Sequence, residues 1–272
     1  MSGKTRQGAG WLLTEVGEDP IFIPEEMNDE QKAFGQTVLD FVEKEVYPNS
    51  EKIEKKEEGV SVGLLKKAGE IGLLMAEIPE AYGGLGMNKV TTTALSEAAT
   101  KQGSWTVSYM CHTGIGTLPI LYFGNEEQKQ KYLPKLASGE YIGAYALTEA
   151  GSGSDALAAK TKAVLSEDGK HYILNGEKMF ITNGAWADVI TVFAKVDGEH
   201  FTGFIVERDH EGVSAGKEEV KLGIHGSSTT PIILEDAKVP VENVLGEIGK
   251  GHKIAFNVLN IGRWKLGAAC TG

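Results

Sequence analysis

The chain has 272 residues and a formal net charge of −11, with 41% hydrophobic and 24% charged residues. This length favours two domains, and the composition is typical of a soluble globular protein. The negative charge argues against a nucleic-acid partner, and no apolar run is long enough for a transmembrane segment. Cys111 and Cys270 lie far apart and lack the spacing of a zinc site. We therefore expect reduced thiols, no bound metal and a cytoplasmic protein, or a mitochondrial-matrix protein if the source is eukaryotic.

The first half of the chain shows helical patterning. Residues 1–24 have no hydrophobic period and are interpreted as an N-terminal arm, and residues 25–140 are interpreted as a helical domain. Asn28 is a good cap for a first helix, whose apolar residues recur at helical spacing as far as Pro48. Further helices are expected over residues 62–71, 89–100 and 109–122, and from the cap residue Asn125.

From residue 141 the pattern changes to short apolar or alternating runs. Strands are expected over residues 141–147, 158–165, 171–174, 189–194, 201–206, 232–234 and 238–241. Asp168-Gly169 and Asp197-Gly198 are placed as hairpin turns between strands. The sequence thus predicts an α+β protein. A small antiparallel β-barrel or sandwich over residues 141–248 follows the helical domain, and residues 249–272 form the first helix of a C-terminal helical domain.

The stretch from 144 to 156 (A-Y-A-L-T-E-A-G-S-G-S-D-A) carries the strongest sign of a ligand site. An alternating strand leads to Thr148 and then to a glycine-serine turn, where successive backbone N–H groups can bind an anion. The spacing Gly151-x-Gly153-x-x-Ala156 loosely matches a dinucleotide-binding fingerprint, but a hairpin pattern follows it where that fingerprint requires a helix. A solvated Gly-Ser linker is a third interpretation. The residues alone favour a ligand loop on a β domain.

The segment Y-A-L-T-E-A-G-S-G-S-D at 145–155 resembles the first flavin signature of the acyl-CoA dehydrogenases, and K-M-F-I-T-N-G at 178–184 resembles the second. I-P-E-A-Y-G-G-L-G at 78–86 and V-P-V-E-N-V-L-G at 239–246 resemble other segments of that family. The resemblance extends from about residue 25 to residue 272. In the family a C-terminal helical bundle follows, so we expect this chain to contain only its opening helix.

The resemblance implies an FAD-dependent enzyme that converts an acyl-CoA to the trans-2-enoyl-CoA in fatty acid β-oxidation. It places Thr148 on the flavin pyrimidine edge, Phe180 against the ring, Thr182 near N5 and O4, and Ser154 on the diphosphate or the pantetheine arm. Core, strand and turn roles are the alternatives for these residues. The full set of implied cofactor residues is Tyr145, Leu147, Thr148, Gly153, Ser154, Phe180, Ile181 and Thr182, and the implied substrate residues are Ser154, Asn260 and Arg263.

The resemblance also implies what lies beyond the chain. The catalytic glutamate of most members belongs to the C-terminal domain. Some members carry it near Gly262, where this sequence has no side chain, so no base is assigned here. Acyl-CoA, electron-transfer flavoprotein and a homo-oligomer of the full-length protein are the implied partners, and the motif N-I-G-R-W at 260–264 most resembles long-chain members. A flavin oxidase or monooxygenase on the same fold, or a non-catalytic truncated product, are the alternatives, and His225 receives no catalytic role.

Overall fold

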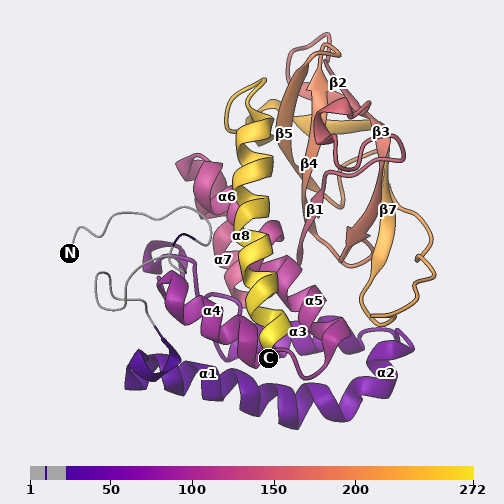
Figure 1. Ribbon diagram of the computed structural model, residues 1–272. Coiled ribbons are helices and arrows are strands. Elements are labelled where there is room, and N and C mark those ends of the chain that lie inside the picture. The colour runs from indigo at the N-terminus through magenta and orange to yellow at the C-terminus, as the bar shows by residue number, and fades with distance from the viewer. Residues whose placement is uncertain (1–9, 11–22) are drawn as a thin grey trace.

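The computed structural model describes Gly10 and residues 23–272 (Figure 1). The arm predicted for residues 1–24 therefore lies almost entirely outside the described residues. Helices form one layer and a twisted sheet forms the other, and a long C-terminal helix runs alongside both (Figure 1). The chain is α+β, as predicted.

The first helix begins where its cap was predicted. The side chain of Asn28 accepts a hydrogen bond from the Gln31 N–H, and the Gln31 side chain accepts one from the Asn28 N–H, which completes a capping box for α1 (Asp29–Phe41). Pro48 does not end the helical path as predicted. A π turn (Val42–Val46) and a 3-10 turn (Tyr47–Asn49) carry it into α2 (Ser50–Glu54), because a proline in the first turn of a new segment sacrifices no helical hydrogen bond.

The rest of the helical layer packs around a buried aromatic pair. Trp105 stacks on Tyr109 with ring centroids 5.1 Å apart. The single helix predicted over residues 109–122 is instead divided by a π turn (His112–Gly116), and Asn125 caps the last helix of the layer as expected. The remaining helices are α3 (Val60–Glu70), α4 (Lys89–Ala98), α5 (Gly103–Cys111), α6 (Leu118–Phe123) and α7 (Glu126–Ser138).

The sheet has eight strands in the order β6-β7-β3-β2-β4-β5-β8, with β1 also paired to β4. The predicted antiparallel barrel or sandwich needs two corrections: the path of paired strands is open and not closed into a barrel, and β1 and β2 both run parallel to β4. The two short runs predicted at 232–234 and 238–241 belong to one strand. The strands are β1 (Gly143–Ala146), β2 (Lys162–Leu165), β3 (His171–Thr182), β4 (Val189–Val196), β5 (His200–Glu207), β6 (Val213–Ala215), β7 (Thr229–Pro240) and β8 (Val244–Leu245).

β1 and β2 occupy successive halves of one edge of β4. Residues Gly143 to Ala146 pair with the first half of β4, and Lys162 and Ala163 pair with its end. The glycine-serine stretch therefore leaves the sheet between two half-strands and returns to the same edge. β2 and β3 form the predicted hairpin at Asp168-Gly169, and β4 and β5 form the one at Asp197-Gly198, where both turn residues have positive φ.

α8 (Gly251–Thr271) joins the two layers and is drawn in yellow in Figure 1. Ile254, Ala255 and Val258 form its buried face, in a core shared with β5 and with α6 and α7. Two further cores lie inside the sheet domain and inside the helical layer. None of the helices in the described part of the chain combines the length and hydrophobicity needed to span a bilayer.

Candidate functional site

A β-bulge in β3 brings the two signature segments together. The pairing of β3 with β7 shifts register between Lys178 and Ile181, opposite Pro231. A proline has no N–H to donate to a sheet, and bulges are among the few places where a strand tolerates one. The Met179 N–H turns away from β7 at this bulge and donates to the Thr148 carbonyl oxygen at 2.8 Å. The end of the first signature therefore lies directly beside the middle of the second.

Phe180 is the most unusual residue of the bulge. Its φ is 59°, a left-handed conformation that costs roughly 1–2 kcal/mol for a residue with a Cβ. Its side chain is nevertheless 57% exposed, so no protein core offsets that cost. A strained backbone that presents an aromatic ring to solvent is typical of a ligand contact.

Several hydrogen-bonding groups around the bulge have no partner on the described chain. The hydroxyls of Thr148 and Thr182 make no hydrogen bond there, and neither do the backbone N–H groups of Thr148, Gly153 and Ser154. Thr148 and Thr182 are half-buried, whereas Gly153 and Ser154 are exposed on the loop. Free donors at this density fit a polar, flat or phosphorylated ligand.

Three predicted cofactor residues have their side chains in the protein core. Tyr145, Leu147 and Ile181 are buried, and Tyr145 packs edge-on against Phe193 with ring centroids 5.2 Å apart. The Tyr145 hydroxyl donates to the Ala255 carbonyl of α8 at 3.3 Å, and burial raises its pKa although the Arg263 charge opposes the shift. These side chains shape the sheet and dock α8 on it, and the surface open to a ligand is formed by their neighbours.

An apolar cavity of about 250 Å³ opens between α5, α8 and the end of β3. Thr182 and Arg263 both line this cavity. Two other predicted substrate residues do not line it. Ser154 lies on the exposed loop, and Asn260 lies beside the cavity, where it accepts a hydrogen bond from the Arg263 guanidinium at 2.9 Å. No carboxylate lines the cavity in the described part of the chain. Its lining residues are Val107, Met110, Cys111, Ile115, Thr182, Leu259, Gly262, Arg263, Lys265 and Leu266.

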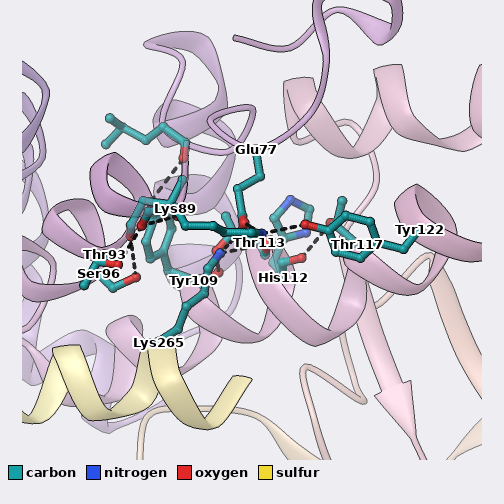
Figure 2. Close-up of polar contacts among 12 residues, drawn as sticks. Glu77, Lys89, Thr93, Ser96, Tyr109, His112, Thr113, Thr117, Tyr122 and Lys265 are labelled. Carbon is teal, nitrogen blue, oxygen red and sulfur yellow. Dashed lines mark hydrogen bonds and ion pairs between the residues drawn. The ribbon is translucent and has the colours of Figure 1, made fainter. Parts of the chain in front are cut away.

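An ionic cluster around the buried side chains of Glu77 and Lys265 holds α8 against the helical layer. Figure 2 shows Lys265 reaching from α8 toward Glu77, which also binds Lys89. Lys89 in turn contacts the Tyr122 hydroxyl at 2.5 Å and lies 6.0 Å from the centre of the Trp264 ring. Lys265 and Arg263 both line the cavity, so this cluster anchors the segment of α8 that carries Arg263.

His112 ties the π turn to β1. Its Nδ1 accepts a hydrogen bond from the Gly143 N–H at 3.0 Å, so its Nε2 carries the proton donated to the Leu136 carbonyl at 2.9 Å. The ring is completely buried, and burial lowers its pKa to about 4. A neutral histidine therefore locks the helical layer to the strand that leads to Thr148.

A second buried ion pair was not predicted from the sequence. Lys178 Nζ lies 2.7 Å from Glu149 Oε1, behind the surface formed by Thr148 and Phe180. Both residues are in the recognised motifs, but no local spacing relates them. An inward-facing lysine in a strand pattern was the available signal, since a buried lysine requires a partner. No cluster of three or more His, Cys, Asp or Glu side chains suited to a metal occurs among the residues that the structure describes.

Comparison with known proteins decides the family. Residues 28–140 match the family model of the acyl-CoA dehydrogenase N-terminal domain, and residues 144–237 match that of the acyl-CoA dehydrogenase middle domain.

The chain belongs to the acyl-CoA dehydrogenase family.

Relatives of known name agree with this assignment. The chain is 57% identical to a probable acyl-CoA dehydrogenase of Bacillus subtilis over 98% of its own length and 45% of that protein. It is 38% identical to the human mitochondrial very long-chain specific acyl-CoA dehydrogenase over 97% of its length and 42% of that protein. A crystal structure of a Bacillus anthracis acyl-CoA dehydrogenase complexed with FAD superposes with a TM-score of 0.91 at 57% identity, over 92% of this chain and 44% of that one. The chain thus spans less than half the length of these three acyl-CoA dehydrogenases.

Proposed function

We propose that this chain forms the flavin-binding and acyl-facing part of an FAD-dependent acyl-CoA dehydrogenase, which converts an acyl-CoA to the trans-2-enoyl-CoA. The observation that carries the proposal is the bulge. It places free donors of Thr148 beside an exposed, strained Phe180, next to a cavity lined by Thr182. The similar Bacillus anthracis enzyme binds FAD, and the residues present here fit that group.

In this proposal the cofactor is held by the free groups of the bulge and the loop. Thr148 and Thr182 bind the polar edge of the isoalloxazine, Phe180 covers a ring face, and Gly153 and Ser154 donate to the diphosphate. Each hydrogen bond contributes about 1 kcal/mol net, so the affinity depends on many such bonds and on ring burial. Bound FAD supplies a hydride acceptor at N5.

The apolar cavity between α5 and α8 receives the acyl chain. Most of its exposed lining surface is apolar, with Met110, Ile115 and Leu259 on its walls. Water is excluded from such a surface, and this exclusion strengthens the electrostatic interactions at the reacting carbons. Arg263, paired with Asn260, is placed at the cavity to contact the polar part of an acyl-CoA.

The proton at the α carbon requires a base from elsewhere. Gly262 lines the cavity without a side chain, and no carboxylate of the described residues lines it. We assign the base to a residue outside this 272-residue sequence. The electron acceptor is electron-transfer flavoprotein, and the assembly of the full-length protein is a homo-oligomer. The acyl chain is long, in line with the motif N-I-G-R-W at 260–264.

An anaerobic titration of the purified full-length protein tests this function. Addition of palmitoyl-CoA should bleach the flavin absorbance and produce the trans-2-enoyl-CoA, and electron-transfer flavoprotein should restore the absorbance. A flavin-containing protein that is not bleached by acyl-CoA, but that consumes oxygen with a nitroalkane or an aromatic compound, would contradict the proposal and favour an oxidase or monooxygenase. A purified protein without flavin would point to a non-catalytic product.

A further inference from the structure

The buried pair of Lys178 and Glu149 lies directly behind the bulge. The Lys178 side chain is 0% exposed and the Glu149 side chain 8% exposed, and the two atoms Nζ and Oε1 are 2.7 Å apart. Removing two charges from water is costly, and their mutual attraction offsets that cost only where further hydrogen bonds satisfy both groups. A pair at this position therefore calls for a specific reason.

Residues at the far end of the loop donate several hydrogen bonds to the Glu149 carboxylate. Glu149 accepts hydrogen bonds from the Lys160 N–H at 2.6 Å, the Thr161 N–H at 3.1 Å and the Thr161 hydroxyl at 2.6 Å. Burial alone would raise the pKa of Glu149, but the hydrogen bonds from Lys178, Thr161 and Lys160 hold it below its ordinary value. Glu149 thus remains an anion that anchors Lys178 at a fixed place.

The ammonium has a second acceptor, the Leu147 carbonyl oxygen, at 3.3 Å. That carbonyl belongs to the peptide whose other end is the Thr148 N–H, which has no acceptor on the described chain. A hydrogen bond from a cation to a carbonyl polarises the whole peptide, and polarised chains of hydrogen bonds strengthen one another. The Thr148 N–H is therefore a stronger donor than an ordinary amide.

A second hydrogen bond, from β3, also holds Thr148 in place. The Met179 N–H, adjacent to Lys178, donates to the Thr148 carbonyl oxygen at 2.8 Å. Thr148 is thus held at its carbonyl by β3, and its N–H is polarised through the preceding peptide by Lys178. Both interactions leave its N–H and hydroxyl free for a ligand.

We propose that Lys178 is a positioning residue that acts through the Leu147–Thr148 peptide to stabilise negative charge on the ligand held by Thr148. The inference rests on the proposed function, in which that ligand is the polar edge of FAD. The reduced flavin carries more negative charge than the oxidised flavin, so a polarised donor favours reduction. Glu149 limits this effect because its negative charge partly cancels the positive charge of Lys178.

The test is a redox titration of the full-length holoprotein at a slightly acidic pH, which favours the ammonium form because burial lowers the pKa of Lys178. Lys178→Met should shift the flavin midpoint potential to a more negative value and weaken FAD binding. Glu149→Gln should shift the potential to a more positive value, because it leaves the ammonium uncompensated. The double variant should lie between the two.

Opposite shifts separate a charge effect from a loss of packing. Lys238→Met breaks the exposed pair between Lys238 and Glu211 in the same sheet and should leave the potential unchanged. Three results would overturn the inference and indicate that the pair is purely structural. They are a midpoint potential of Lys178→Met equal to that of wild type, shifts of the same sign in both single variants, and equal loss of FAD from both. A wild-type protein that binds no FAD would instead refute the proposed function.

Discussion

The N–H of Met179 donates to the carbonyl oxygen of Thr148 at 2.8 Å. This bond exists because Pro231, on the neighbouring strand, opposes a bulge in β3, which frees the Met179 N–H from the ladder. It joins two motifs that the sequence separates, and it holds Thr148, with its free donors, beside the bulge that carries the exposed Phe180.

Thr148→Val should weaken FAD binding without changing the stability of the protein. The Thr148 hydroxyl makes no hydrogen bond to the described chain, so its loss affects only the ligand. We expect the FAD dissociation constant of the full-length protein to rise roughly 2- to 10-fold, the value of one net hydrogen bond. Thr161→Val is the matched control. It removes a buried hydroxyl bonded to Glu149 at 2.6 Å and should lower the free energy of unfolding by about 1–3 kcal/mol. A stability loss of that size in Thr148→Val would show that its hydroxyl serves the fold.

Phe180→Gly should separate ligand binding from stability. Glycine adopts positive φ without strain, and the exposed ring contributes no core burial, so the free energy of unfolding without FAD should stay within about 1 kcal/mol of wild type. FAD binding should nevertheless weaken, as measured by the recovery of flavin fluorescence on dissociation. Ile224→Gly is the control, because Ile224 is also exposed and has a φ of 51° but lies outside the bulge. Equal FAD affinity in Phe180→Gly and wild type would exclude a ring contact.

Gly116→Ala should disturb the contact between the helical layer and β1. A Cβ at this position would lie 2.7 Å from the Gly143 carbonyl carbon, which the backbone cannot relieve without a shift. We expect a loss of about 1–3 kcal/mol in urea unfolding, the usual cost of overpacking. Gly114→Ala, in the same π turn, meets only the Lys265 side chain at 4.0 Å and should be nearly neutral. Similar losses of unfolding free energy in the two variants would mean that any side chain added to the π turn destabilises the protein, and that the contact with β1 is not the cause.

His112 should make stability depend on pH. Its pKa is about 4 in the folded protein, below the ordinary value of 6.5, so the unfolded chain binds the proton more readily between these values. Stability should therefore be complete above pH 6.5 and fall as the pH decreases toward 4, by about 2 kcal/mol between pH 7 and pH 5. His112→Gln should remove this part of the slope in urea unfolding at the two pH values. Identical slopes for wild type and variant would show that His112 is protonated without cost.

Local features of the fold could be predicted because their causes lie within a few residues. Asn28 and Asn125 cap helices through bonds to residues three positions later, and Asp197-Gly198 supplies the positive φ that its hairpin requires. The parallel pairing of β1 with β4 could not be predicted this way. Short apolar strands carry no mark of direction, and the partner of β1 lies more than forty residues away.

The candidate site likewise combines features with local causes and features that depend on distant parts of the chain. Resemblance to known motifs points to Thr148, Thr182 and Phe180, and the hydrogen bond from the Met179 N–H to the Thr148 carbonyl brings the two segments that carry them together. Phe180 lies in a bulge opposite Pro231 of β7, and the Lys178–Glu149 pair depends on the path of the loop back to β2. Neither is encoded by local spacing, so only the folded chain reveals why the two motifs must occur together.

A crystal structure of the full-length protein with FAD bound would show directly where the flavin lies. We predict that the isoalloxazine lies on the bulge, with its polar edge within hydrogen-bond distance of Thr148, its ring against Phe180 and Thr182 beside it. A flavin bound away from β3, or a Thr148 N–H that contacts only solvent in that complex, would contradict it.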